Sequence, residues 1–388
     1  MLAGPRQSGK TTFAREIVAK DFADTVYFNW DLAKDKRRLI ADPGFFSREP
    51  RSSVKSKPLV ILDELHKYRD WKNYLKGVCD QFAGEYQFLV TGSGRLEYSR
   101  KAGDSLAGRF LRFHIFPFTM AELSARRKTV REFINNPLEG FDDAPGAETA
   151  ETFHSLWELS GFPEPFTRGR KAFWSRWSAA YGQQIVRDDM RTLADIRNLD
   201  TLELLSALIP SRVGSPLSMN NLAGDLQVAF DTVKNWLLLF DSLYLTFRLS
   251  PWTAKISRSI LKEKKMYLFN FPVIDDEAAR FENLVAVELL RAVETWSDFG
   301  WGRFSLHYLK NKEKQEVDFL IAESNRPFLL VEAKLNDDAP AASLLMFQNR
   351  LNIPSVQLVR RAGIKKVYRN GLQSVLAVTA HRWLSSLP

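Results

Sequence analysis

Residues 4–11 read Gly4-Pro5-Arg6-Gln7-Ser8-Gly9-Lys10-Thr11, the complete G-x-x-x-x-G-K-[ST] pattern of a phosphate-binding loop. The pattern has glycine at both ends because the backbone must curl around a phosphate and point its N–H groups inward. Lys10 then reaches the β- and γ-phosphates, and the hydroxyl of Thr11 binds Mg²⁺. The chain continues from Thr12 as a helix whose N-terminal N–H groups face the anion. We therefore expect the whole segment from Gly4 to Thr12 to bind a nucleoside triphosphate.

A second motif ends a strand-like segment further along the chain, at Leu59-Val60-Ile61-Leu62-Asp63-Glu64. A continuous apolar run is typical of a buried parallel strand, and ligands bind at the C-terminal ends of such strands. Asp63 is then placed to hold Mg²⁺, and Glu64 to orient and deprotonate the attacking water. The alternative is a chance match followed by an ordinary helix cap. The order and spacing of the two motifs favour a nucleoside triphosphatase.

Two further residues are candidates for assisting hydrolysis. The strand predicted over Gln87–Ser93 ends in a polar turn, where Ser93, or Thr91, would meet the γ-phosphate or the attacking water. An ordinary Ser/Gly turn explains the same residues equally well. Arg109 is a candidate arginine finger, a planar cation for the charge that develops on the transferred phosphoryl group. The alternative for Arg109 is an arginine on a surface turn.

Residues 1–120 alternate strand-like and helix-like segments, which predicts an α/β fold with a parallel sheet and flanking helices. Besides the two strands named above, a strand is expected at Thr25–Trp30 and a helix over Trp71–Phe82. Only Met1-Leu2-Ala3 precede the phosphate-binding loop, whereas the strand that feeds such a loop is normally longer. Either this strand is cut short or the chain begins inside a longer protein.

The composition permits a nucleic-acid partner without requiring one. The 388 residues carry a formal net charge of +9, and a basic excess attracts polyanions but also occurs on simple solvated surfaces. The single cysteine, Cys79, excludes a disulfide within the chain, which suits a reducing compartment. No apolar run approaches the ~20 residues that a membrane span needs, and no signal peptide is evident. We expect a cytoplasmic protein without a membrane partner.

The middle of the chain is predicted to be helical. Residues 155–196 are dense in tryptophan and arginine and read as helix. Three shorter helices follow, the second with Ser218 as its N-cap and the third over Phe230–Asp241, and then a strand at Leu243–Leu249. Three short helices followed by a β-ribbon are typical of a winged helix-turn-helix. Lys234 is the one basic residue on the polar face of the third helix, which is little charge for binding DNA. The alternative is that these helices are a packing module between domains.

A helix predicted over Phe281–Val293 carries two carboxylates on different faces. Glu282 shares its face with apolar residues, where a carboxylate is costly unless it has a role. Glu288 lies on another face and is expected to be solvated. A short strand is expected before this helix, at Lys265–Phe269. Glu282 is therefore a candidate member of a functional site.

Two strands joined by a turn follow this helix and carry the remaining candidates. Strand period two puts Glu332 and Lys334 on the same side of the second strand, and Asp318 lies on the first. An acid followed by E-x-K across a hairpin is the arrangement of metal-dependent nucleases. Asp318 and Glu332, with Glu282 beside them, would bind Mg²⁺, and Lys334 would position or help to activate the water. The plainer alternative is an edge hairpin with polar ends.

Taken together, these motifs resemble a family of prokaryotic AAA-type P-loop ATPases with a C-terminal domain of unknown function, formed by a winged helix and a restriction-endonuclease-like domain. The resemblance covers nearly the whole chain and departs from the family at the N-terminus, where the family has a lead-in segment before the loop. It rests on residues 4–12, Leu62-Asp63-Glu64 with His66 and Trp71, residues 90–93, 105–109 and 116–123, Asn221-Leu222-Ala223, residues 281–285, Glu316-Val317-Asp318-Phe319 and Glu332-Ala333-Lys334.

The resemblance implies four regions. These are a P-loop AAA-type ATPase domain without its lead-in (1–125), a helical linker (126–200), a winged-helix-like domain (201–255) and a restriction-endonuclease-like domain (256–388). It also implies ATP and Mg²⁺ as ligands. Two functions stay open: ATP hydrolysis coupled to a DNA-acting nuclease-like domain, and an ATP-dependent regulatory switch whose C-terminal domains bind DNA or protein without cleavage. If Arg109 acts as an arginine finger across a subunit boundary, the protein is a homo-oligomer.

Overall fold

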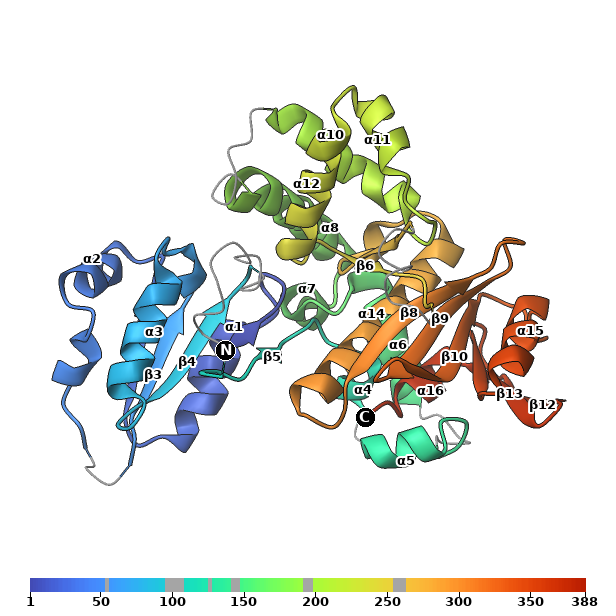
Figure 1. Ribbon diagram of the computed structural model, residues 1–388, viewed down its shortest axis with the longest axis horizontal. Helices are drawn as coiled ribbons and strands as arrows, with labels where there is room; N and C mark the ends of the chain where they lie inside the picture. Colours follow the sequence, from blue (N-terminus) through green and yellow to red (C-terminus); the bar gives the residue numbers. More distant parts are fainter. Residues whose placement is uncertain (53–55, 95–107, 125–127, 141–146, 191–197, 254–262) are drawn as a thin grey trace. The chain divides into compact units, whose positions relative to one another are not determined.

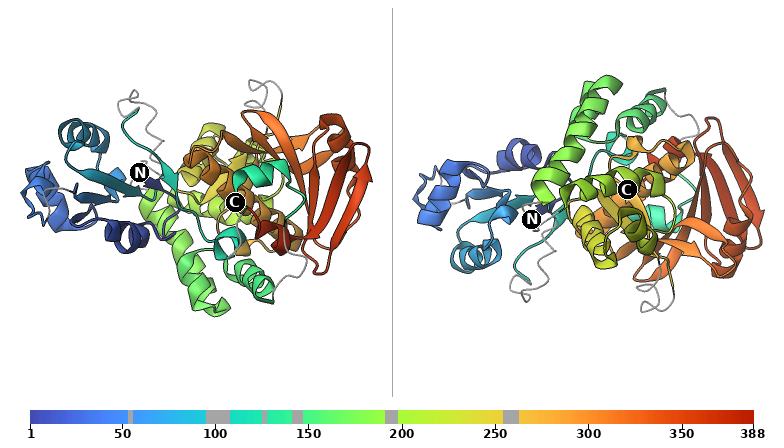
Figure 2. Two further views of the ribbon diagram at one scale, coloured as in Figure 1. Left: turned by 90° about the horizontal axis from the view of Figure 1, so that it is seen from below. Right: turned by 90° about the horizontal axis from the view of Figure 1, so that it is seen from above.

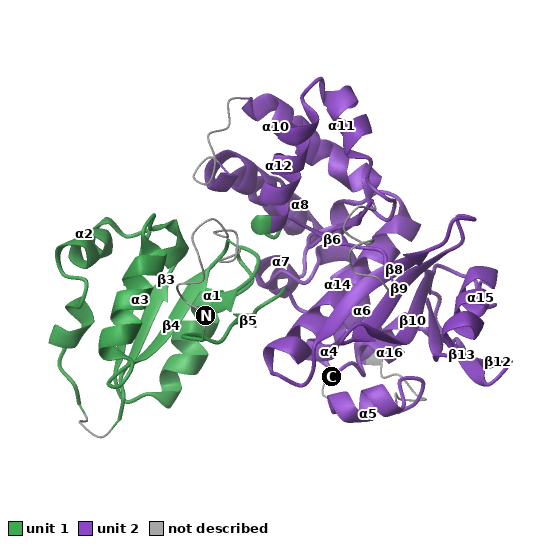
Figure 3. Cartoon of the chain, viewed as in Figure 1, with its two compact units in different colours: residues 1–116, 242–244 green, residues 117–241, 245–388 purple. Residues whose placement is uncertain are grey.

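The computed structural model describes residues 1–388 except 53–55, 95–107, 125–127, 141–146, 191–197 and 254–262. The chain divides into two compact units (Figure 3). Unit 1 comprises residues 1–116 with 242–244, and unit 2 comprises residues 117–241 with 245–388. Each unit is built on one main sheet of its own. In the described part of the chain, no helix is long and apolar enough to cross a membrane.

Unit 1 contains a five-stranded sheet in the order β2-β3-β4-β1-β5, and every pair of neighbouring strands is parallel (Figure 1). The predicted parallel sheet is therefore confirmed. The first strand is two residues long and lies between β4 and β5. The strands are β1 (Leu2–Ala3), β2 (Thr25–Asn29), β3 (Leu59–Asp63), β4 (Gln87–Gly92) and β5 (Phe113–His114).

The middle strand β3 is buried on both faces, as its continuous apolar run predicts. Val60 and Leu62 belong to one apolar cluster, with side chains of α3, whereas Leu59 and Ile61 belong to a second cluster around Ala14. The strand is thus held from both sides, and its end at Asp63 is fixed. The helical segments of unit 1 are α1 (Lys10–Thr12), η1 (Phe13–Ile17), η2 (Val18–Asp21), α2 (Ala33–Ala41), η3 (Phe45–Arg48), η4 (Leu65–Lys67) and α3 (Trp71–Phe82).

Unit 2 begins with helices, and the helical region predicted over 155–196 is interrupted at two positions. Ser160, with φ of 62°, separates α6 from α7, and Gly169, with φ of 65°, separates α7 from α8. Left-handed φ ends a right-handed helix, and a composition rich in helix formers does not reveal these two positions. The last predicted residues, 191–196, lie outside the described chain. The segments are α4 (Met120–Leu123), α5 (Val130–Asn135), α6 (Ala147–Leu159), α7 (Pro163–Arg168), α8 (Lys171–Gln184) and η5 (Ile185–Asp189).

The three shorter helices are present where they are predicted. They are α10 (Leu199–Leu208), which runs into η6 (Ile209–Arg212), then α11 (Met219–Leu226) and α12 (Phe230–Ser242). The side chain of Ser218 accepts a hydrogen bond from the backbone N–H of Asn221, which confirms it as the N-cap of α11. The strand that follows, β6 (Thr246–Leu249), pairs antiparallel with β7 (Lys265–Leu268).

The rest of unit 2 surrounds a mixed six-stranded sheet in the order β12-β13-β11-β10-β9-β8, drawn orange to red in Figure 2. Strands β8 to β10 form antiparallel hairpins, and β10, β11 and β13 are parallel. The strands are β8 (Phe304–Lys310), β9 (Glu316–Glu323), β10 (Arg326–Lys334), β11 (Ser355–Val359), β12 (Lys365–Asn370) and β13 (Gln373–Thr379). The helices are η7 (Phe271–Val273), α14 (Glu277–Asp298), α15 (Ala342–Leu351) and α16 (Ala380–Leu384).

Candidate functional sites

The phosphate-binding loop follows β1 in a conformation that requires its glycines. Gly4 has φ of 151°, and a Cβ at this position would lie 2.0 Å from the carbonyl oxygen of Ile115. Gly9, with φ of 92°, precedes α1. Both glycines are therefore needed for backbone geometry, as the pattern predicts. The segment from α1 to η2 is helical, although its middle turn is a π-helix.

Lys10 lies inside this loop and is buried. Its ammonium donates to the carbonyl oxygens of Gly4 at 3.0 Å and Pro5 at 2.5 Å. Burial lowers the pKa of Lys10 to about 8, although the nearby carboxylates of Glu64 and Asp63 oppose this shift. The buried hydroxyl of Ser8 has no hydrogen-bond partner in the described chain. The Lys10 ammonium and the unpaired Ser8 hydroxyl are thus the groups that the motif provides for phosphate oxygens.

Asp63 connects the two sequence motifs. Its carboxylate accepts hydrogen bonds from the hydroxyl groups of Thr11 at 2.8 Å and Tyr27 at 2.7 Å, and also from Thr91. The pairing of Thr11 with Asp63 agrees with the sequence prediction that both serve one cation. Tyr27 was not predicted. Burial and its bond to Asp63 raise the pKa of Tyr27 well above the ordinary value, so it remains a hydrogen-bond donor.

Glu64 follows directly and lies in a strained, left-handed conformation with φ of 55°. Its carboxylate accepts a hydrogen bond from Ser93 at 3.2 Å and lies 3.4 Å from the ammonium of Lys67. His66 Nδ1 is 3.7 Å from the same oxygen. Burial lowers the pKa of His66 to about 4, so this ring is neutral at neutral pH. The sequence left Ser93 and Thr91 as alternatives, and in the structure they bind different carboxylates.

Arg109 is not brought to this group of residues within the chain. Its guanidinium donates to Asp80 Oδ1 at 2.9 Å, near the C-terminal end of α3. Arg109 lines a cavity together with Met1 and Gln87, which lie at the N-terminal ends of β1 and β4. The phosphate-binding loop follows the opposite end of β1. A finger role for Arg109 therefore requires a second subunit. Residues 105–107 of its motif lie outside the described chain.

Unit 2 holds a second group of charged side chains, arranged around Lys265. The Lys265 ammonium is 2.9 Å from Glu282 Oε1, 2.5 Å from Glu316 Oε1 and 3.7 Å from Asp318 Oδ1. The hydroxyl of Tyr267 also donates to Glu282 Oε1, at 2.7 Å. Burial alone would lower the pKa of Lys265, but the three carboxylates raise it above the ordinary value. We call Lys265, Glu282, Glu316, Asp318, Glu332 and Lys334 the carboxylate cluster.

The other half of the carboxylate cluster lies across the β9–β10 hairpin. Lys334 Nζ is 2.7 Å from Glu332 Oε1, which confirms that these side chains share a side of β10. Glu332 Oε2 accepts the backbone N–H of Asp318 at 3.3 Å, and Asp318 Oδ2 accepts the backbone N–H of Ala333 at 3.0 Å. The structure thus brings all four predicted residues together, with Glu282 arriving from α14.

The charge balance of the carboxylate cluster depends on its lysines. Burial and the charge of Asp318 raise the pKa of Glu282 and of Glu332 well above the ordinary value for glutamate. Lys265 opposes the shift of Glu282, and Lys334 opposes the shift of Glu332. A divalent cation needs several ligand atoms close together. Among the described residues, these carboxylates do not form a group of three or more whose ligand atoms all lie within 4.8 Å of one another. As arranged, the cluster is neutralised by lysine rather than shaped around one divalent cation.

Sequence reasoning missed two members as site residues, Glu316 and the central Lys265. Lys265 was predicted only as the first residue of a short strand, which is correct, but its side chain is almost fully buried. The available signal was a lysine that begins an apolar strand, facing a helix with Glu282 on its apolar side. A buried lysine requires such a partner.

Glu288 corrects a sequence expectation, because it is buried rather than solvated. Its carboxylate accepts hydrogen bonds from the backbone N–H of Met120, at 2.9 and 3.1 Å, at the first residue of α4. Burial raises the pKa of Glu288 to about 8. The periodicity of α14 identified one apolar face, but it could not show that α4 packs against another.

Comparisons with known proteins separate an N-terminal region, which corresponds to most of unit 1, from regions within the rest of the chain. Residues 1–124 match the family described as an AAA domain, and residues 150–271 and 278–380 match two families described as domains of unknown function, DUF8612 and DUF4143. An uncharacterized protein of Methanocaldococcus jannaschii is 24% identical over 87% of this chain and 75% of its own length. An uncharacterized protein of Mycobacterium tuberculosis is 24% identical over 84% of this chain and 68% of its own length.

Proposed function

We propose, for a chain that carries an AAA domain followed by two domains of unknown function, that unit 1 binds ATP with Mg²⁺ and hydrolyses the ATP. The observation that carries the proposal is the 2.8 Å hydrogen bond from the Thr11 hydroxyl to Asp63, which joins the two motifs. A triphosphate fits this loop for two reasons. Gly4 gives the backbone its required geometry, and the buried Lys10 and the unpaired Ser8 hydroxyl supply donors. Thr11 and Asp63 would hold Mg²⁺, which supplies positive charge at the phosphates when bound.

The residues around the loop have separate roles in this proposal. The Lys10 ammonium exchanges its loop carbonyl partners for phosphate oxygens, and the nearby charges of Glu64 and Asp63 favour its protonated form. Glu64 accepts a proton from the attacking water, and Ser93 holds the Glu64 carboxylate in position. Arg109 would act on the γ-phosphate of a neighbouring subunit, which makes a homo-oligomer part of the proposal.

Calorimetric titration with ATP and Mg²⁺ tests the nucleotide site directly. Wild-type protein is expected to bind, and Lys10→Ala is expected to lose binding because the phosphates would be paired with backbone alone. Lys20→Ala is a matched control, because Lys20 lies in the same helical segment, in η2. Equal affinity of Lys10→Ala and wild type would overturn the assignment.

For unit 2 we propose a role on DNA, with α10–α12 as a winged-helix-like module and the six-stranded sheet as a restriction-endonuclease-like domain. Asp318, Glu332 and Lys334 on adjacent strands favour phosphodiester cleavage as its activity. Lys265 opposes this reading, because it already neutralises Glu282 and Asp318. The carboxylates therefore do not fit a divalent cation as they stand, and we derive no cleavage step.

The alternative for unit 2 is an ATP-dependent switch that binds DNA or protein without cutting. A cleavage assay on duplex and single-stranded DNA with Mg²⁺ or Mn²⁺ separates the two functions. Cleavage that is lost in Asp318→Ala would support the nuclease. Absence of cleavage in wild-type protein that binds the same DNA would support the switch.

A further inference from the structure

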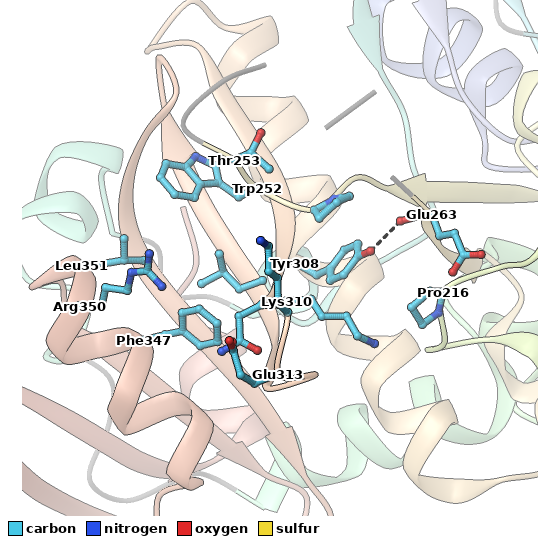
Figure 4. Close-up of a pocket in the computed structure, with 14 residues that line it drawn as sticks. Pro216, Trp252, Thr253, Glu263, Tyr308, Lys310, Glu313, Phe347, Arg350 and Leu351 are labelled. Atoms are coloured by element: carbon cyan, nitrogen blue, oxygen red, sulfur yellow. Dashed lines mark hydrogen bonds between the residues drawn. The ribbon is translucent and has the colours of Figure 1, made fainter. Parts of the chain in front are cut away.

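A pocket of about 780 Å³ lies in unit 2 at the edge of the six-stranded sheet (Figure 4). Its lining begins with the end of the outermost strand, β8, at Tyr308–Lys310. The segment 251–253 runs along β8, with the backbone N–H of Trp252 bonded to Tyr308 O at 2.8 Å. The last turn of α15 contributes Phe347 and Arg350. Pro216, Glu263 and the turn 311–313 complete the lining.

Three aromatic rings line this pocket, from three different elements. They are Trp252, Tyr308 and Phe347. Trp252 and Phe347 pack into the same apolar cluster, which fixes their rings. The indole N–H of Trp252 is enclosed and has no acceptor in the described chain. Fixed aromatic faces are suited to a planar ligand such as a nucleobase.

The same pocket carries cations at its mouth. Arg350 and Lys312 are exposed, and neither has an ion-pair partner in the described part of the protein. Lys310 is committed to Glu316, at 2.7 Å. Two acids, Glu263 and Glu313, also line the pocket, and they equal Lys312 and Arg350 in number once Lys310 is counted with Glu316. Free cations beside aromatic faces match a ligand that has both bases and phosphates.

Two residues of the pocket, Lys310 and Tyr308, contact members of the carboxylate cluster. Lys310 and Lys265 bind the two oxygens of the same carboxylate, that of Glu316. The Lys265 ammonium also lies 5.7 Å from the centre of the Tyr308 ring. In Figure 4 the Tyr308 hydroxyl points to Glu263, on the side of the pocket away from Arg350.

We propose that this pocket binds unpaired nucleotides of single-stranded DNA, with a base against Trp252 and phosphates at Lys312 and Arg350. The proposal rests on the DNA role proposed for unit 2, and it names the form of DNA. Duplex DNA has its bases stacked inside, so it cannot place a base on Trp252 unless the helix opens. Single-stranded DNA offers both the base and the phosphate.

Fluorescence anisotropy of the full chain with a labelled oligothymidylate tests the proposal. Trp252→Ala is expected to weaken binding roughly tenfold or more, because loss of one stacked base costs ~1–3 kcal/mol. Trp252→Phe should restore most of the affinity, which separates stacking from a folding defect. Lys312→Glu and Arg350→Glu should weaken binding and lower the slope of log K against log salt by about 0.7 for each phosphate that the variant no longer neutralises.

The matched control is Lys314→Glu, which makes the same charge change on the same turn at a position outside the pocket. Its affinity should stay close to that of wild type. Tight binding of oligothymidylate that none of the pocket variants weakens would overturn the pocket while leaving a DNA role for unit 2. Equal binding of the matching duplex, or of thymidine monophosphate at the same site and affinity, would also overturn it. Failure of wild type to bind any DNA would overturn the pocket and the DNA role together.

Discussion

Thr11 and Asp63 are 52 residues apart in the sequence, and their side chains meet in a hydrogen bond of 2.8 Å. The bond spans from the first turn after the phosphate-binding loop to the end of β3. Thr91, on β4, donates to the other oxygen of the same carboxylate. Asp63 is therefore fixed by side chains from separate elements before any ligand binds. Such preorganisation is what a magnesium site for phosphoryl transfer needs.

Glu64→Gln is expected to keep ATP bound while stopping its turnover. The amide retains the size of the side chain but cannot accept a proton from water. Phosphate release measures turnover, and calorimetry measures ATP affinity for the same protein. Ser93→Ala should give a smaller loss of turnover, because it removes only the hydrogen bond that holds the Glu64 carboxylate. Normal hydrolysis by Glu64→Gln would exclude this residue as the base.

Arg109→Ala is expected to lower turnover strongly with little change in ATP affinity, provided that Arg109 acts on a neighbouring subunit. Mixing Arg109→Ala with Glu64→Gln should then restore part of the activity, because some interfaces combine an intact finger with an intact base. Asp80→Ala removes one partner that Arg109 has within its own chain and should leave turnover largely unchanged. A loss of turnover in Asp80→Ala equal to that in Arg109→Ala would make the ion pair structural.

The sequence predicted the parts of the two sites that follow from local patterns. Continuous apolar runs located the buried strands, and the loop motif located Lys10 and Thr11. Strand period two placed Glu332 and Lys334 together. The strand ends at Asp63 and Ser93 meet because parallel strands finish at one edge of a sheet.

The parts that could not be predicted depend on packing between distant segments. His307 pairs with Leu320 and Leu309 pairs with Val317, so one residue of β8 lies opposite two of β9, Asp318 and Phe319, and the ladder bulges there. A bulge changes which side of the sheet a residue faces, and the hairpin pattern does not reveal it. Lys265 was missed for a related reason, because its three carboxylate partners come from α14 and from β9.

Lys265→Met is expected to lower the melting temperature of the protein and to create a response to divalent cations. Without the Lys265 ammonium, Glu282 and Asp318 would lose the cation that faces them, while Glu316 would keep Lys310. Breaking a buried ion pair costs about 3–5 kcal/mol. Mg²⁺ or Mn²⁺ could then supply the missing charge, so these ions should raise the melting temperature of the variant more than that of wild type.

Lys310→Met is the matched control for this comparison, because the Lys310 ammonium pairs with Glu316 but its side chain is 33% exposed. It should cost little stability and give no new response to the ions. A response to Mn²⁺ that is as large in wild type as in Lys265→Met would show that Lys265 does not take the place of a metal ion.

Glu288→Gln is expected to remove a loss of stability that wild-type protein shows as the pH rises from about 5 to about 8. Burial raises the pKa of Glu288 from its ordinary value to about 8 in the folded protein, so the folded state holds a proton that the unfolded state has released in this range. The unfolding free energy therefore falls with rising pH, by on the order of 4 kcal/mol for this one group. Glutamine keeps an oxygen for the Met120 N–H but does not titrate.

Thermal melts of both proteins between pH 5 and pH 8.5 should converge at low pH and diverge at high pH, with the variant melting higher. Glu288→Ala, which removes the acceptor, should melt lower than Glu288→Gln at every pH. Parallel curves for wild type and Glu288→Gln would mean that the buried carboxyl does not titrate in this range.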